Sequence, residues 1–210
     1  RRNFKISPRC GYLKIHSLIL RIQMKKFSLF ALIFALFFGA CFNGSGVLEM
    51  PRISFSAPIS DAKHFITLSV YDLRSKPNII GSVKNSDLSV NAKVSPSEPL
   101  ASWLRVALVR KLSQNQISVK ASKDEASANV EIKIREFYAN IDSIGQNNMR
   151  GNFALEIIIK KQQNSTTTLK LTQPMSDFAL MPAMSSLEPF IKELLLDMLA
   201  RSAKEIANNL

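Results

Sequence analysis

The stretch "NVEIKIREFYANI" occupies residues 129–141 and decides the fold class. Apolar and charged side chains alternate from Val130 to Ile134, which predicts a strand with one buried face and one solvent-facing side. The apolar positions then move by one residue and continue from Phe137 to Ile141. Such a change of parity within one strand indicates a β-bulge near Glu136.

Two more strands are expected after this one. The segment "DSIGQNNMRGN", residues 142–152, is rich in Gly and Asn, which predicts a hairpin loop. Alternation returns in "FALEIIIKK", residues 153–161, and "TLKLTQ", residues 168–173, follows a polar turn. Successive strands with short connections predict an antiparallel meander.

Upstream, "FITLSVYDL" at residues 65–73 alternates in the same way and predicts another strand. Two helices are expected from apolar residues that recur at helical spacing. Ser97 is the expected N-cap of the first helix, and Ser185 with Glu188 has the capping-box spacing at the start of the second. The two stripes are Leu100, Trp103, Leu104, Ala107, Leu108 and Leu112, and then Leu187, Phe190, Ile191, Leu194, Leu195, Met198 and Ile206.

The order of these elements predicts an α+β fold. Two amphipathic helices on one face of a sheet bury both apolar surfaces, so we expect a two-layer sandwich with a mostly antiparallel sheet. A helical stripe of this kind can also bind a membrane or a partner, but core packing is its usual role. The expected domain covers residues 64–210.

Residues 24–40, "MKKFSLFALIFALFFGA", have the pattern of a signal peptide. Two lysines precede an apolar run of about 12–15 residues, which is short for a helix that crosses a bilayer. Residues 1–23 contain no methionine, and we expect them to be a start-site artefact. Residues 41–63 carry Gly, Ser and Pro without helical periodicity, which favours a flexible tether between a membrane and the domain.

The sequence "FGAC", residues 38–41, resembles a bacterial lipobox. That resemblance implies that Cys41 becomes the first residue of the mature chain and carries a diacylglyceryl group and an acyl chain such as palmitate. The alternative is an uncleaved apolar helix without lipid. Phe42 stands where Asp favours inner-membrane retention in enteric bacteria, so the outer membrane is expected, with the inner membrane as the other possibility.

The charge distribution argues against a nucleic-acid partner. The chain has a net charge of +12, but residues 1–40 hold eight basic residues and no acidic one. From Cys41 onward there are 20 basic and 16 acidic residues, so the mature body is only mildly basic. A nucleic-acid binder needs a basic face on its folded domain.

No pattern of enzyme chemistry is present in the mature sequence. His64 is its only histidine, and Cys41 is its only cysteine, so a Cys/His zinc cluster cannot form. The sequence has no nucleophile elbow and no glycine-rich phosphate loop. We therefore expect no catalytic residue, no metal and no cofactor.

Several segments of the body together resemble the YajG-like lipoproteins of Gram-negative bacteria. These are "LSVYDLRSKPNIIGSV", "LASWLRVALVRKLSQNQISV", "ANVEIKIREFYANID", "MRGNFALEIII" and the C-terminal helix. The most specific match is the D-x-R of Asp72 and Arg74, followed by Ile80 and Gly81. The resemblance implies acylation of Cys41 and a domain that faces the periplasm, and it brings no catalytic residues.

These observations predict a non-enzymatic binding or assembly module with an envelope protein as its partner. Asp72 and Arg74 in the 72–87 loop are the tentative partner-binding residues, and the 143–151 hairpin is the other candidate, because loops commonly carry function. The alternative is a transport-assembly subunit that contacts lipopolysaccharide. That function requires a basic cluster, which would contain Lys133, Arg135, Arg150, Lys160 and Lys161. An enzyme would need a pocket of convergent polar groups around His64.

Overall fold

A computed structural model describes residues 45–54, 62–85, 87, 89–143, 148–162 and 165–210. The signal peptide, Cys41 and the tip of the 143–151 hairpin lie outside the described residues. Residues Gly44–Leu210 form one compact unit. Among the described helices, none is both long enough and apolar enough to cross a bilayer.

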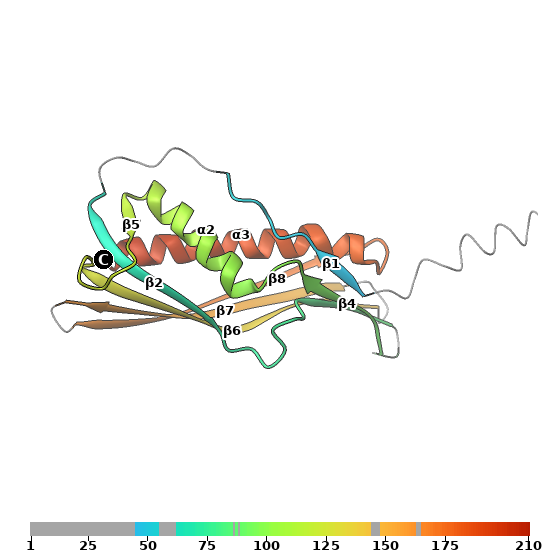
Figure 1. The fold of residues 1–210 in the computed structure, drawn as a ribbon. Coiled ribbons are helices and arrows are strands. Elements are labelled where there is room, and N and C mark those ends of the chain that lie inside the picture. The colour runs from blue at the N-terminus through green and yellow to red at the C-terminus, as the bar shows by residue number, and fades with distance from the viewer. Residues whose placement is uncertain (1–44, 55–61, 86, 88, 144–147, 163–164) are drawn as a thin grey trace, which may run out of the picture. The chain divides into compact units, whose positions relative to one another are not determined.

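The described body contains eight strands and two helices (Figure 1). The strands are β1 (Gly46–Leu48), β2 (His64–Asp72), β3 (Gly81–Lys84), β4 (Val90–Pro96), β5 (Ile117–Val119), β6 (Ala128–Asp142), β7 (Asn148–Lys161) and β8 (Thr166–Phe178). The helices are α2 (Leu100–Gln114) and α3 (Met184–Asn208).

All eight strands belong to one mixed sheet. The expected meander is confirmed, because β6, β7 and β8 pair antiparallel in sequence order. However, β2 and β3 both run parallel to β6, and β1–β4 and β2–β5 are also parallel pairs. The predicted α+β class is therefore correct, but the predicted two-layer sandwich with a mostly antiparallel sheet is wrong. The sheet is mixed and curls into a half-barrel (Figure 1).

The bulge predicted near Glu136 is confirmed and helps to curl the sheet. The register between β6 and β7 shifts between Ile134 and Glu136, so Arg135 is an extra residue on β6. A bulge bends its strand and increases the local twist. Beyond the bulge, Phe137 packs edge-to-face on Phe153, with their ring centroids 4.8 Å apart.

Both helices cover the same face of the sheet and contact each other (Figure 1). The predicted apolar stripes are confirmed, because every residue in them is buried. The predicted caps are wrong: Pro99 and Ala183 occupy the two N-cap positions, and neither gives a side-chain cap. Ser97 instead accepts a hydrogen bond from the backbone N–H of Met50 through its Oγ.

Residues 46–54, which the sequence analysis assigned to a tether, pack on the domain. They begin with β1, which pairs with β4, and Leu48 and Met50 are buried. The chain then crosses α2, where the indole Nε1 of Trp103 donates to the carbonyl of Pro51 at 2.9 Å. Contacts with the domain are therefore described from Gly46 onward, five residues after Cys41.

Candidate functional site

Asp72 and Arg74, the D-x-R pair, form an ion pair at the end of β2. The Nε of Arg74 donates to Oδ1 of Asp72 at 2.9 Å, and its Nη2 donates to Oδ2 at 2.7 Å. This two-pronged geometry is the strong arrangement for a guanidinium and a carboxylate. The side chains are only 5% and 13% exposed, for Arg74 and Asp72 respectively.

Arg74 also fastens the loop that joins β2 to β3. Its Nη2 donates to the carbonyl of Pro77 at 2.7 Å and its Nη1 to the carbonyl of Ile79 at 3.0 Å. The guanidinium carbon lies 6.0 Å from the ring centroid of Phe137. We call this arrangement the Asp72–Arg74 clamp. Direct partner binding by the two residues stays a prediction, and their burial leaves the loop that they hold more accessible than their own charges.

The clamped loop lies beside the part of β6 where the pairing with β2 has ended and the pairing with β3 has not yet begun. On this side of β6, pairing with β2 ends at Asp72 opposite Ile134, and pairing with β3 begins at Ser82 opposite Asn140. In the interval between them, residues 136–139 have ladder partners only on β7, and Arg135 is the bulged residue. On the other side of β6, the backbone N–H of Ala139 donates to the carbonyl of Ile80 at 3.1 Å. The bulge lies in the same interval, so the sheet bends where the two parallel strands separate.

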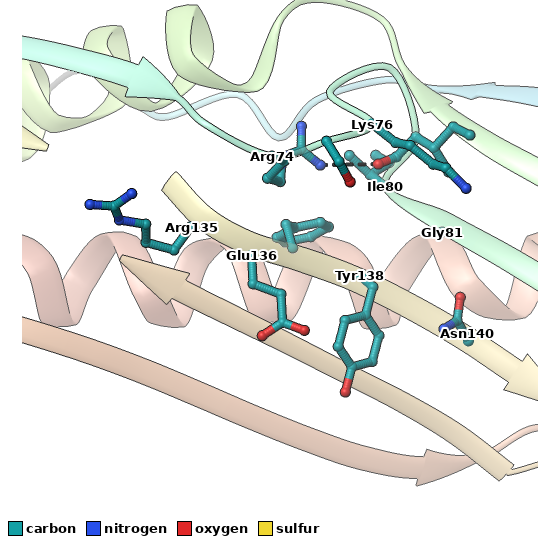
Figure 2. Close-up of a pocket in the computed structure, with 11 residues that line it drawn as sticks. Arg74, Lys76, Ile80, Gly81, Arg135, Glu136, Tyr138 and Asn140 are labelled. Carbon is teal, nitrogen blue, oxygen red and sulfur yellow. Dashed lines mark hydrogen bonds between the residues drawn. The ribbon is translucent and has the colours of Figure 1, made fainter. Parts of the chain in front are cut away.

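A recess of about 360 Å³ lies between this loop and β6 (Figure 2). In Figure 2, the labelled side chains of Glu136 and Tyr138 extend away from Arg74, while Arg135 points along the sheet. The recess is lined by Arg74, Ser75, Lys76, Ile79, Ile80, Gly81, Arg135, Glu136, Phe137, Tyr138 and Asn140. The lining thus combines cationic, anionic, amide and aromatic groups.

Several polar groups of the lining already have partners in the protein. Asn140 accepts a hydrogen bond from Ser82 at 2.7 Å, and Glu136 accepts one from Asn152 at 2.8 Å. Among the described residues, no ion pair or side-chain hydrogen bond engages the ammonium group of Lys76. Lys76 is thus the cationic group of the recess that is available to a partner.

Charges on the sheet surface beside the recess occur in opposite pairs. Arg135 forms an ion pair with Glu156 on β7, with its Nε 2.9 Å from Oε2. The hydrogen bond from Arg135 lowers the pKa of Glu156, and the nearby charges of Arg135, Lys133 and Lys170 add to this effect. Lys133 in turn pairs with Glu131 at 3.2 Å.

The basic residues that would make a lipopolysaccharide site do not gather in one place. Arg150 lies opposite Asn140, whereas Lys160 lies opposite Asn129 at the other end of β7. Strand geometry separates these two positions by about 33 Å. Lys133 and Arg135 are neutralised by their acidic partners. The basic cluster expected for that function is therefore not formed.

His64 does not take part in this recess. It is the first residue of β2 and is exposed, and Ile117 on β5 lies opposite it. Within the described part of the chain, no three His, Cys, Asp or Glu residues are close enough to hold a metal ion.

The Asp72–Arg74 pair and the 72–87 loop were predicted from the sequence as a candidate binding surface, and they form one wall of the recess. The wall on β6, formed by Glu136, Phe137, Tyr138 and Asn140, was not predicted, and within the loop neither Lys76 nor the carbonyls of Pro77 and Ile79 were singled out. A local signal was present, because a loop signalled by Pro77 and Gly81 directly follows the D-x-R. Buried arginines commonly satisfy loop carbonyls in addition to a carboxylate.

The fold and the site define an α+β domain with a clamped loop and a recess of mixed polarity. The chain belongs to a family of bacterial proteins described as "Uncharacterized lipoprotein", which matches residues 51–206. No curated protein matches the sequence.

Two solved structures with TM-scores of at least 0.50 show the same fold at low sequence identity. A Xanthomonas campestris protein of the family DUF330 is 13% identical with a TM-score of 0.55, and the match covers 78% of this chain and 96% of that one. A crystal structure described as an uncharacterized protein is 14% identical with a TM-score of 0.50, over 80% and 99% of the two chains. Rare lipoprotein B from Shewanella oneidensis is 11% identical with a TM-score of 0.43, over 69% and 92%. None of these proteins is described as an enzyme.

Proposed function

We propose that this protein is a lipid-anchored lipoprotein of the bacterial envelope that faces the periplasm and acts as a non-enzymatic binding or assembly module. Membership of a lipoprotein family carries the proposal, since the family match begins shortly after Cys41, at residue 51. Cys41 follows an apolar signal segment, as lipid attachment requires. Within the family, the D-x-R of the clamp supports a place among the YajG-like lipoproteins.

The outer membrane is the proposed location. Phe42 follows Cys41, where an Asp favours retention in the inner membrane of enteric bacteria. The domain then lies on the periplasmic side, where an envelope protein is the proposed partner. Density-gradient separation of the two membranes tests this, and recovery with the inner membrane contradicts it.

The recess beside the Asp72–Arg74 clamp is the proposed partner-binding surface. Its loop is held in one conformation by four side-chain hydrogen bonds from Arg74, so binding a partner costs little additional loop entropy. Lys76 and Tyr138 supply a cation and a partly exposed aromatic ring at its rim. Loops held on a rigid scaffold are the common place for binding residues.

The anchor is tested by the intact mass of the detergent-extracted protein, with Cys41→Ser as control. We expect the mass of residues 41–210 plus a diacylglyceryl group and an acyl chain, and no lipid on the variant. A mass without lipid that still includes residues 27–40 would contradict lipid anchoring.

The binding surface is tested separately by photo-crosslinking in intact cells. A photoreactive amino acid replaces Lys76 at the recess or, as a matched control, Lys204 on the exposed side of α3. We expect a discrete crosslinked protein from position 76 and none from position 204. Crosslinks of equal yield at both positions, or none at position 76, would reject the recess as the partner site.

A further inference from the structure

An exposed apolar loop joins β8 to α3. Its sequence, "FALMPA" at residues 178–183, contains no charged residue. Phe178 is 66% exposed, Met181 is 64% exposed, and Leu180 is fully exposed. Large apolar side chains are rarely exposed in such a contiguous group unless the surface contacts a membrane or another molecule.

The loop is a structured part of the domain. The carbonyl of Met181 accepts hydrogen bonds from the backbone N–H of Ala183 and from the hydroxyl of Ser186, in the first turn of α3. Ala179 is buried between the exposed side chains of Phe178 and Leu180. The backbone is therefore held in place while the apolar side chains face outward.

The strand register places this loop at one end of the sheet. A single row of paired residues crosses five strands there and consists of Val90, Lys84, Asp142, Asn148 and Phe178. Lys84 and Asp142 within the row neutralise each other in an ion pair of 3.1 Å. Val90 at the opposite end of the row is half exposed.

The N-terminal side of the body enters from the same end. Because β1 runs parallel to β4 with Gly46 opposite Val94, the chain before Gly46 enters from the side of Val90. The side chain of Met184, the first residue of α3, packs against Gly46 in β1. Val47 next to it is 70% exposed and adds a further apolar side chain.

Chain length limits how far this end can lie from the lipid. Five residue steps separate Cys41 from Gly46, so the chain can span at most about 18 Å whatever its path. The four residue steps from Val94 to the end of the row at Val90 already cover about 13 Å. A lipid on Cys41 therefore holds Gly46 within about 18 Å of the bilayer, which keeps this end of the domain close to the membrane.

We propose that the loop at residues 178–183, together with Val47, inserts its apolar side chains among the lipids of the membrane in which Cys41 is anchored. This inference rests on the proposed lipid anchor. The domain then stands with this end on the bilayer. Amphipathic insertion of this kind reaches about 5–10 Å below the headgroups.

The test uses the acylated mature protein in vesicles of phosphatidylethanolamine and phosphatidylglycerol. The thiol of acylated Cys41 is blocked and Cys10 is removed with the leader, so Leu180→Cys supplies the one reactive thiol for an environment-sensitive fluorophore. Thr166→Cys is the matched control, because it is exposed at the other end of β8, about 40 Å away. Circular dichroism verifies that both labelled variants are folded.

We expect lipids that carry a quencher to quench the label at position 180 at least about threefold more strongly than the label at position 166. Equal quenching at both positions would overturn the inference, because the domain would then lie along the bilayer. No quenching at either position on vesicles that carry the protein would also overturn it and would favour a protein partner for the loop. Failure of the protein to float with vesicles would instead reject the lipid anchor itself.

Discussion

The carboxylate of Asp72 accepts two side-chain hydrogen bonds from Arg74, and both side chains are almost withdrawn from solvent. The Nη1 and Nη2 atoms of Arg74 also donate to the carbonyls of Ile79 and Pro77 in the following loop. The pair therefore stabilises the wall of the recess. The two charges are mostly buried, and the loop that they hold forms the surface of the recess.

Arg74→Ala should destabilise the domain by about 3 kcal/mol, because it leaves the mostly buried carboxylate of Asp72 with only the backbone N–H of residue 74 as a donor and removes the guanidinium donors to two loop carbonyls. Arg74→Lys should be intermediate, since an ammonium group cannot reproduce the planar fork of a guanidinium. Urea denaturation followed by circular dichroism measures both variants. Lys192→Ala is the control: it removes an exposed pair with Glu188 and should cost at most about 0.5 kcal/mol. A loss below about 1 kcal/mol for Arg74→Ala would contradict the clamp.

The two helices and the main strands of this fold could be predicted from local sequence patterns. The change of parity between Ile134 and Phe137 located a real bulge, because burial of one sheet face acts on each side chain separately. The helical stripes were found for the same reason. Burial on one face leaves a periodic signal in the sequence itself.

The parallel pairing of β2 and β3 with β6 could not be predicted from the sequence. Parallel pairing joins Leu68 to Val130 and Val83 to Ile141, and both pairs are about sixty residues apart in the chain. No local pattern specifies such a partner, so consecutive strands were expected to pair with each other. The prediction of Ser97 as an N-cap was wrong for a related reason. Its hydroxyl accepts a hydrogen bond from the backbone N–H of Met50, which lies in a distant segment of the chain.

Gly81→Ala should also destabilise the domain, by about 1–3 kcal/mol, through overpacking. A Cβ at position 81 would lie 2.7 Å from the backbone carbonyl oxygen of Ala139, which cannot move without shifting β6. Gly46→Ala is the matched control, because its Cβ would meet only the flexible end of the Met184 side chain. Thermal denaturation compares the two variants. Equal losses of stability would show that contact with the β6 backbone is not what excludes a side chain at Gly81.

The pKa of Glu156 should rise when Arg135 is replaced by Met. In the native protein the hydrogen bond from Arg135 holds this pKa below the ordinary value of 4.5. Because the folded pKa is lowered, the stabilisation is present above pH 4.5 and is lost as the pH falls through the folded pKa. An NMR titration of the Glu156 carboxyl measures the shift. Arg201→Met is the control, since Arg201 donates to Thr172 and Gln173 instead, and an unchanged pKa in Arg135→Met would reject the assigned cause.

Trp103→Phe should release residues 49–54, which follow β1, while leaving the core filled. The indole Nε1 of Trp103 donates to the carbonyl of Pro51, whereas a phenyl ring keeps most of the apolar contact and lacks this donor. Arg52 is exposed beside this contact, so trypsin should cleave after it several-fold faster in the variant.

Arg110→Met removes the neighbouring hydrogen bond to Ile53 and should have a similar but separate effect. Lys111→Met is the control, because Lys111 lies on the same helix without a described contact to this segment. Cleavage at an unchanged rate in both Trp103→Phe and Arg110→Met would mean that pairing of β1 with β4 alone holds the segment. Faster cleavage would show that contacts with α2 hold residues 49–54 on the domain in addition to the pairing of β1 with β4.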